Sequence, residues 1–328
     1  MTWEIIEQFD NYIYQDFLKN KNLKSFYNSF EFSLLMKSNR WTHNLIVNFN
    51  QEKQIDNLVN IFIKQKFRFK LIYIPGGIEG NLNNKLLNDL IQLIRNKYGN
   101  FIVIYFYLHD EEGLLEIKYK KLIKIFNFHN VNTVMKKNLN LPINELSKSY
   151  TKNWRHNLNR SKKFKNVIVK QNPYPDFKEM LILYDEMTRI KKFKSYIDEN
   201  LLNNYFKFFS KNIIHFEARI NEKLIAFRTI IYFENSAWDL FACSNLDSKK
   251  NYATYNILNL IFSQLIEKRI YQFDLSGVDK KNNSGVYNFK KGSGGIIFKK
   301  YGEILYSPII LFSILFSIAI TVKRIFVK

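Results

Sequence analysis

The residues best suited to chemistry lie near the C-terminal end of the chain. A short apolar strand is predicted over 271–275, and Asp274 lies near its end, just before a Ser-Gly turn that ends at Gly277. After a polar loop, the aromatic residue Phe289 precedes Lys290, and a glycine-rich segment follows. Glycines let the backbone approach a ligand closely, and the lysine offers a positive charge to a phosphate or to a developing oxyanion. This pattern predicts a polar site at the end of a strand.

Two adjacent lysines compete for the role of the charged group. Lys290 is the first candidate because it lies between an aromatic residue and the glycine-rich segment, although a solvated surface lysine is the ordinary alternative. Lys291 is the second candidate, since a single sequence does not fix the register to within a residue. Gly277, Tyr287 and Phe289 are predicted to bind substrate in the same site.

A carboxylate near this lysine could accept the proton that an attacking amine releases. Asp274 is the first candidate for such a base, and capping of the Ser-Gly turn is an equally open alternative. Asp239, in a strand expected over 238–243, is a weaker second candidate. Cys243, the single cysteine, is predicted to be a small buried hydrophobic residue because no histidine lies near it in the sequence.

A basic helix face is predicted in the middle of the chain. Arg155 and Lys162 lie on one face of this helix, with Arg160 at its edge, while Trp154 and Leu158 occupy the opposite face. Such a face can bind a phosphate or a nucleotide. A solvated helix face is the alternative on spacing alone.

The elements that must position these residues alternate between apolar strands and amphipathic helices. In the first half, strands at 69–74 and 101–107 are predicted to flank a helix at 82–97. In the second half, the predicted order is a helix from 177, a helix over 196–209, antiparallel strands at 213–220, 224–233 and 238–243, a helix over 253–269 and the strand at 271–275. This order indicates an α+β fold.

Five stretches, at 25–32, 72–77, 139–163, 253–275 and 285–295, follow one another in a characteristic order. This order resembles that of the FemAB/FemX family, whose members have the GNAT acyltransferase fold; the chain is also similar to BioF2-like acetyltransferase domains. The resemblance spans roughly residues 20 to 300 and implies tandem GNAT-like mixed sheets flanked by helices, the first copy being degenerate. It predicts domains at 1–145 and 146–302, followed by an apolar, basic-ended helix at 303–328. The sequence itself shows no convincing repetition between the halves.

The resemblance also implies an activity. Members of such a family transfer an aminoacyl group from aminoacyl-tRNA to an amine of a peptidoglycan precursor, a reaction that needs neither a metal nor a bound cofactor. By the same resemblance, Lys290 would stabilise charge in the acceptor channel and Arg155 would hold an acceptor phosphate.

Two other functions stay open. An acyl-CoA-dependent N-acyltransferase acting on an amino sugar of a surface polysaccharide or lipid-linked glycan would keep the fold and change the donor. CoA-dependent enzymes place Arg or Gln before a Gly-x-Gly step at a helix N-terminus; here Phe289 stands at that spacing, which favours another donor. A non-catalytic, membrane-peripheral binding module is the third possibility.

The composition indicates a polyanionic partner. The chain of 328 residues has 50 Lys and Arg against 29 Asp and Glu, a net charge of +21, which suits RNA, a nucleotide diphosphate or an anionic membrane. The alternative is a composition rich in Lys and Asn that spreads charge evenly over the surface. The five histidines show no metal-binding spacing, so no metal is predicted. The oligomeric state is left open.

The C-terminal segment is unusually apolar. Residues 304–322 form a run of 19 residues without a charge, and Lys323, Arg324 and Lys328 follow it. A spanning helix needs about 20 such residues, but a terminal basic cluster on the outer side opposes the positive-inside tendency. We therefore expect an interfacial helix on an anionic membrane, with packing onto the first domain as the alternative. The acidic N-terminus lacks a secretory pattern, so the expected location is cytoplasmic, at the inner face of the plasma membrane.

Overall fold

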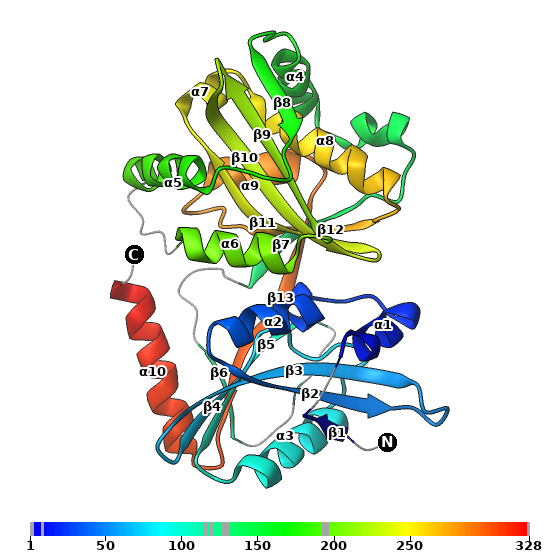
Figure 1. The fold of residues 1–328 in the computed structure, drawn as a ribbon, viewed down its shortest axis with the longest axis vertical. Helices are drawn as coiled ribbons and strands as arrows, with labels where there is room; N and C mark the ends of the chain where they lie inside the picture. The colour runs from blue at the N-terminus through cyan, green and yellow to red at the C-terminus, as the bar shows by residue number, and fades with distance from the viewer. Residues whose placement is uncertain are drawn as a thin grey trace. The chain divides into compact units, whose positions relative to one another are not determined.

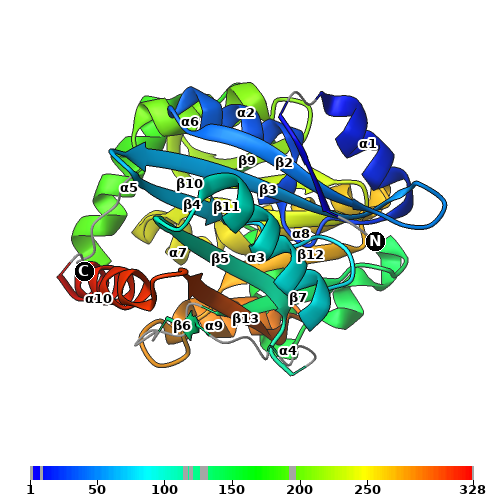
Figure 2. The same cartoon turned by 90° about the horizontal axis from the view of Figure 1, so that it is seen from below.

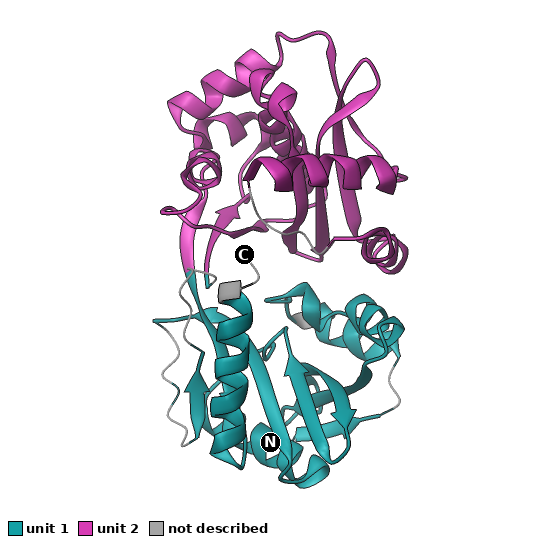
Figure 3. Ribbon diagram, turned by 90° about the vertical axis from the view of Figure 1, so that its left-hand side faces the viewer, with its two compact units in different colours: residues 1–132, 299–327 teal, residues 133–298, 328 magenta. Residues whose placement is uncertain are grey.

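The computed structural model describes residues 3–7, 10–113, 117, 121–125, 132–191 and 197–326. Two compact units are present, and they are coloured separately in Figure 3. Unit 1 comprises residues 1–132 and 299–327, and unit 2 comprises residues 133–298. Residue 196, where one helix is predicted to begin, and Lys328 of the basic C-terminus lie outside the described residues.

Unit 1 combines a mixed sheet with helices on both of its faces (Figure 1). Its strands are β1 (Trp3–Ile6), β2 (Thr42–Phe49), β3 (Ile55–Lys66), β4 (Phe69–Ile74), β5 (Ile102–Glu111), β6 (Leu122–Lys124) and most of β13 (Ile296–Tyr306). Its helices are α1 (Asn11–Asn20), the 3-10 helix η1 (Phe26–Asn28), α2 (Phe30–Ser38), α3 (Asn84–Tyr98) and α10 (Ile310–Phe326). Strands β1 to β4 pair antiparallel in chain order, β5 is parallel to β4, and β13 is antiparallel to β5.

The amphipathic helix α3 supplies the main core of unit 1. Asn83 caps its first turn by accepting a hydrogen bond from the backbone N of Leu86 at 2.9 Å, and Gly99 ends it with a left-handed φ of 84°. The apolar side of α3, including Leu90 and Ile94, packs against buried residues of the central strands such as Ile72. Figure 2 shows α3 in front of these strands.

The opposite face of the unit 1 sheet carries α1, η1, α2 and α10. Phe32 of α2 packs edge-on against Phe62 of β3, with ring centroids 5.6 Å apart. At the other side of the same face, Phe312 and Phe316 of α10 pack against a small buried cluster that includes Val103. The C-terminal helix therefore covers part of the first unit.

Buried polar contacts join η1 to the loop after β4. Asn28 donates from Nδ2 to the carbonyl O of Gly76 at 2.9 Å and to Oε1 of Glu79 at 3.0 Å. Glu79 also accepts from the backbone N of Lys24 at 2.7 Å and of Ser25 at 3.1 Å. Burial raises the pKa of this carboxyl to about 7, against the lowering effect of these donors and of the Lys24 charge. Two stretches that carry the family resemblance, 25–32 and 72–77, thus meet in space.

Unit 2 repeats this arrangement with other elements. Its strands are β7 (Thr133–Asn138), β8 (Val167–Gln171), β9 (Ile213–Ile220), β10 (Lys223–Phe233), β11 (Ser236–Ser244) and β12 (Gln272–Gly277). Its helices are η2 (Ile143–Ser149), α4 (Lys152–Ser161), α5 (Phe177–Lys191), α6 (Glu199–Phe208), α7 (Leu246–Lys250), α8 (Ala253–Glu267) and α9 (Ser284–Gly292). Strands β8 to β11 pair antiparallel in chain order, β12 is parallel to β11, and β7 is antiparallel to β12.

Helices cover both faces of the unit 2 sheet. Phe262 of α8 packs against Phe273 of β12, and Trp154 of α4 joins the same core. On the opposite face, Tyr184 of α5 contacts Phe227 of β10 edge-on, with ring centroids 5.3 Å apart. The alternation of side chains along each strand sends neighbouring residues to these two different cores.

The two units share one topology, and each sheet is completed by a strand that is exchanged between the two halves of the chain. In each, a strand precedes two helices, three antiparallel strands follow, and a helix (α3 or α8) crosses over to a parallel strand (β5 or β12). The strand that completes each sheet comes from the other half of the chain, because β7 pairs with β12 and β13 pairs with β5. The repeat that the sequence did not show is therefore present as topology.

This exchange explains where the units differ from the domain limits of the sequence analysis. Those limits, at 145 and 302, follow chain order and leave β7 in the first domain. The compact units assign β7 to unit 2, and they assign α10 with most of β13 to unit 1. Sheet pairing holds the two strands there, and α10 packs against the unit 1 sheet.

Most predicted elements are confirmed, with one correction at the C-terminus. The strand at 213–220 coincides with β9, and the helix at 82–97 corresponds to α3. The apolar run from 304 is not one helix: residues 304–306 complete β13, and α10 begins at Ile310. Apolar composition alone does not separate a buried strand end from the helix that follows it. Within the described residues, no helix is long and apolar enough to cross a membrane.

Candidate functional site

The candidate site lies in unit 2 where two parallel strands stop pairing. Strands β11 and β12 are paired only through Ser236–Trp238 and Gln272–Asp274, although both strands continue further. Two irregularities adjoin this point. Strand β10 has a register shift against β11 between Thr229 and Ile230, and β12 has one against β7 between Asp274 and Gly277. Register shifts of this kind re-aim side chains and are frequent beside active sites.

Four charged side chains gather around this point from four elements. They are Arg228 of β10, Asp239 of β11, Asp274 of β12 and Lys290 of α9. Each side chain is nearly buried. Two positive and two negative charges offset one another here, which makes the burial of all four groups tolerable.

Lys290 is held by the end of β12. Its Nζ donates a hydrogen bond to the carbonyl O of Gly277 at 2.9 Å, and the residue is only 6% exposed. Burial lowers the pKa of its ammonium group, while the charges of Asp239 and Asp274 act in the opposite direction. The Lys290 side chain is thus a hydrogen-bond donor in a place that water barely reaches.

Arg228 and Asp239 form the second pair of the cluster. A guanidinium nitrogen of Arg228 lies 3.6 Å from Oδ2 of Asp239, and the guanidinium group stands 5.5 Å from the ring centroid of Phe289. Burial raises the pKa of the Asp239 carboxyl, and the charges of Arg228 and Lys290 oppose that rise. Among the residues that the structure describes, Oδ1 of Asp239 has no hydrogen-bond partner. One carboxylate oxygen is thus buried without a hydrogen bond from these residues.

Asp274 has a structural contact in addition to its place in the cluster. Its Oδ1 accepts a hydrogen bond from the backbone N of Ser276 at 2.7 Å, and Ser276 adopts a left-handed φ of 67°. A side chain that accepts from the backbone two residues later stabilises such a turn. The capping role considered for Asp274 is therefore present, and its role as a base stays a prediction.

The glycine-rich segment differs from its expected form. Residues 284–292 form helix α9, and the segment at 292–295 ends that helix. The backbone N of Gly294 donates to Lys291 O at 3.0 Å, and that of Gly295 donates to Lys290 O at 3.1 Å. These amides close a helix C-terminus, so they are not free to cradle a phosphate. Glycine suits position 294 because the backbone there has a φ of 87°, a conformation that residues with a side chain rarely adopt.

The other residues predicted for this site separate into buried and exposed groups. Tyr287 is buried in the core of unit 2, and Phe289 is half-buried, 5.0 Å from the ring of Tyr255. Gly277 is exposed and supplies the carbonyl that holds Lys290. Lys291 is exposed, which distinguishes it from its buried neighbour.

The predicted basic face lies on the outer side of α4. Arg155, Arg160 and Lys162 are all exposed, and the guanidinium group of Arg160 stands 4.4 Å from the ring centroid of Tyr252. Helix α4 packs on α9, because the backbone N of Thr151 donates to the carbonyl O of Gly292 at 2.9 Å. The basic face and the buried cluster are therefore on adjoining helices, and the structure shows no direct contact between them among the residues it describes.

Sequence reasoning missed Arg228 and Lys137. Apart from Lys223 at its start, Arg228 is the one charge in the apolar strand β10, and this interruption is the signal that could have identified it. Lys137 of β7 is also buried, and its Nζ donates to Oγ of Ser149 at 2.8 Å. Burial lowers the pKa of Lys137 to about 8.

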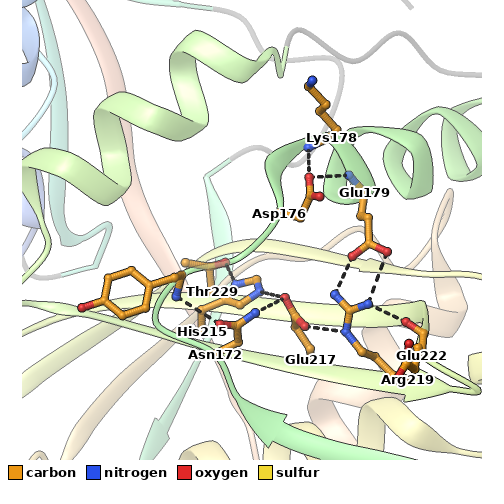
Figure 4. Close-up of polar contacts among 10 residues, drawn as sticks. Asn172, Asp176, Lys178, Glu179, His215, Glu217, Arg219, Glu222 and Thr229 are labelled. Atoms are coloured by element: carbon orange, nitrogen blue, oxygen red, sulfur yellow. Dashed lines mark hydrogen bonds and ion pairs between the residues drawn. The ribbon is translucent and has the colours of Figure 1, made fainter.

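A separate polar network surrounds Glu217 of β9 in unit 2, and Figure 4 shows it. Glu217 accepts from Nε of Arg219 at 2.8 Å and from Nδ2 of Asn172 at 3.0 Å, and its Oε1 lies 3.3 Å from Nε2 of His215. Nδ1 of His215 lies 2.7 Å from the Thr229 hydroxyl. Burial raises the pKa of Glu217, but the contacts with His215 and Arg219 outweigh it and bring the pKa to about 2. Burial lowers the pKa of His215, and the contact with Glu217 acts in the opposite direction.

The fold of each unit, a mixed sheet flanked by helices in which a helix crosses over to a parallel strand, is that of a GNAT-like acyltransferase. The comparisons with known proteins agree with this class. The FemAB family matches residues 119–315, more than half of the sequence, and the chain belongs to that family. The chain is thus an acyltransferase.

Solved structures with the same fold share little sequence with this chain. FemX superposes with a TM-score of 0.75 at 12% identity, covering 93% of this chain and 97% of that one. A conserved protein of unknown function from Bacteroides thetaiotaomicron has a TM-score of 0.58 at 13% identity, with coverages of 90% and 95%. L-PGS from Bacillus licheniformis has a TM-score of 0.51 at 14% identity, with coverages of 94% and 96%. No curated protein matches the sequence significantly.

Proposed function

We propose that this protein transfers an aminoacyl group from aminoacyl-tRNA to an amine of a peptidoglycan precursor. Membership of the FemAB family and the likeness to FemX support an aminoacyltransferase of cell-wall synthesis. The net charge of +21 suits a tRNA substrate, whose backbone is a polyanion. The acceptor would be an amine carried on a nucleotide-linked or lipid-linked cell-envelope precursor.

The reaction is an attack of a neutral amine on an ester carbonyl. The amine nitrogen forms a bond to the carbonyl carbon, the carbonyl oxygen becomes an oxyanion, and the amine then loses a proton. Collapse of the tetrahedral intermediate breaks the ester bond, and the ribose oxygen leaves as a hydroxyl after it takes up a proton. The chain needs to supply a cation for the oxyanion and a group that accepts the proton from the amine. No bound cofactor and no metal enter this scheme.

The observation that carries the proposal is a buried lysine beside two buried carboxylates. Lys290 can donate to the oxyanion from a site that excludes water, where such a contact is strongest. Asp239 is favoured over Asp274 as the proton acceptor, because one of its oxygens lacks a hydrogen-bond partner among the described residues. A raised pKa also makes the Asp239 carboxylate a better base than an ordinary aspartate.

Substitution of Lys290 provides the test, and its neighbour provides a matched control. We expect Lys290→Ala to lower kcat for acyl transfer by about 100-fold or more, as loss of an oxyanion donor does. Lys291→Ala removes an identical but exposed side chain from the same helix and should leave kcat within about twofold. Full activity of a folded Lys290→Ala variant, checked by circular dichroism, would remove the assigned role.

A further inference from the structure

The C-terminal helix α10 has two apolar faces, and only one of them is covered. Phe312, Phe316 and Ile320 pack against the sheet of unit 1. The opposite face carries large apolar side chains that are between 41% and 55% exposed; these are Ile310, Leu311, Ile314, Leu315, Ile318 and Val322. Single exposed apolar residues are ordinary, but a continuous row along one helix indicates a binding surface.

The helix is fixed to unit 1 at both ends, so its exposed face is held in one orientation. Near its start, Phe312 contacts the rings of Phe69 and Phe101, with centroids 5.7 and 6.3 Å away. Near its end, the guanidinium group of Arg324 donates two hydrogen bonds to the carboxylate of Glu303, at 2.6 and 2.8 Å. Arg324 is therefore turned inward and is not part of the exposed basic end that the sequence suggested.

A second exposed apolar group adjoins the start of α10. The turn between β3 and β4 places Phe67 at its tip, where the side chain is 87% exposed. Because Phe69 contacts Phe312, this turn and the first turn of α10 are neighbours within unit 1. We define the α10 surface as the exposed face of α10 together with Phe67; Figure 1 shows the helix running along one side of unit 1.

The charges around the α10 surface are positive. Lys66 and Arg68 flank Phe67 and are exposed. Lys121 donates to the carbonyl O of Pro308 at 2.9 Å, beside the start of α10, and Lys323 is exposed near its end. Helix α10 itself contains no Asp or Glu. An apolar surface with a basic rim matches a bilayer whose headgroups are anionic.

We infer that the α10 surface docks on an anionic lipid bilayer. The apolar side chains of α10 and the ring of Phe67 would enter the boundary between headgroups and acyl chains, while the flanking lysines and Arg68 contact the anionic headgroups. A second copy of the chain is a poorer occupant, because self-association through this surface would bring equal basic rims together. The surface can hold the protein on a membrane whichever acyl group it transfers.

The test is co-sedimentation of the full chain with phosphatidylglycerol vesicles and with phosphatidylcholine vesicles. We expect tighter binding to phosphatidylglycerol and a loss of that preference in high salt. The triple variant L311S/L315S/I318S should bind at least about tenfold more weakly. Its matched control, I168S/I182S/I190S, removes three exposed isoleucines from unit 2 and should bind as the unsubstituted chain does.

The charges and the alternative occupant are tested on the same material. Lys66→Gln and Arg68→Gln should each weaken binding to phosphatidylglycerol by up to about fivefold. Circular dichroism establishes that each variant is folded. Equal sedimentation of the triple variant and its control would overturn the inference. A second result would also overturn it: the unsubstituted chain does not bind vesicles and forms a dimer in analytical ultracentrifugation, and the triple variant does not form that dimer.

Discussion

Arg228 and Lys290 face Asp239 and Asp274 in a part of unit 2 that solvent barely reaches. Removal of one member of such a cluster leaves its opposite charge buried and uncompensated, which is costly. Loss of activity in a variant therefore needs to be separated from loss of folding. Amide replacements keep the size of the carboxyl side chains, and a pH profile reports the group that titrates.

The two aspartates are predicted to differ in the pH dependence of transfer. We expect Asp239→Asn to lower kcat/KM by a factor of about 100 or more and to remove the acidic limb of its pH profile, because the proton acceptor is lost. Asp274→Asn should retain that limb and lower the thermal unfolding temperature, because the Ser276 turn loses its charged acceptor. The measurement is the steady-state rate of transfer from pH 5 to pH 9. If Asp274→Asn removed the acidic limb and Asp239→Asn retained it, the result would contradict Asp239 as the base.

At the scale of the element, β9 carries a polar network on a strand that is otherwise part of the core. Glu217 is buried, and its pKa of about 2 lies below the ordinary value of 4.5. A carboxyl group with a lowered pKa in the folded state adds stability above pH 4.5, and this contribution is lost as the pH falls toward 2. The shift corresponds to about 3 kcal/mol in total.

Glu217→Gln is predicted to reduce the acid sensitivity of folding. Between pH 7 and pH 3 the unsubstituted chain should lose about 2 kcal/mol of unfolding free energy through Glu217 alone, and the variant should lack that loss although it is less stable at pH 7. Urea unfolding followed by circular dichroism at the two pH values gives the comparison. Glu145→Gln, at an exposed carboxyl, is the control; the same pH sensitivity in the Glu217 variant and the unsubstituted chain would refute this account.

Several elements and part of the site could be predicted from sequence, for identifiable reasons. The 3.6-residue period of α3 and the polar turn between β9 and β10 are local signals, and both elements lie where they were expected. The proximity of Lys290 to Asp239 is not local, because it depends on the parallel pairing of β11 with β12 and on the helical form of residues 284–292. Arg228 could not be assigned to the site from sequence, because one charge in an apolar strand does not reveal which buried groups offset it.

At the scale of the molecule, the exchange of terminal strands determines which fragments can fold. Strand β7 precedes the rest of unit 2 in the chain and pairs with β12, the strand that carries Asp274. Met135 and Leu139, in and just after β7, belong to the unit 2 core. A fragment that begins at the domain limit of 146 lacks this strand, so it leaves the edge of β12 open and the core incomplete.

Fragments 133–298 and 146–298 are predicted to behave differently. The longer fragment contains every strand of the unit 2 sheet described above and should unfold cooperatively in urea. The shorter fragment should be less stable by several kcal/mol or should aggregate, because β12 loses its antiparallel partner and two buried side chains. Circular dichroism during urea unfolding and light scattering give the comparison. Equal stability of the two fragments would show that β7 is dispensable.

The central claim is that the chain moves an aminoacyl group onto an amine of a peptidoglycan precursor, and mass spectrometry of the acceptor tests it most directly. The purified chain is incubated with the precursor and charged tRNA, and in parallel with acetyl-CoA; Lys290→Ala and Lys291→Ala are run alongside. The account predicts an amino-acid mass increment that requires charged tRNA, persists in Lys291→Ala and disappears in Lys290→Ala. An acetyl increment from acetyl-CoA, or no increment with either donor, would contradict it.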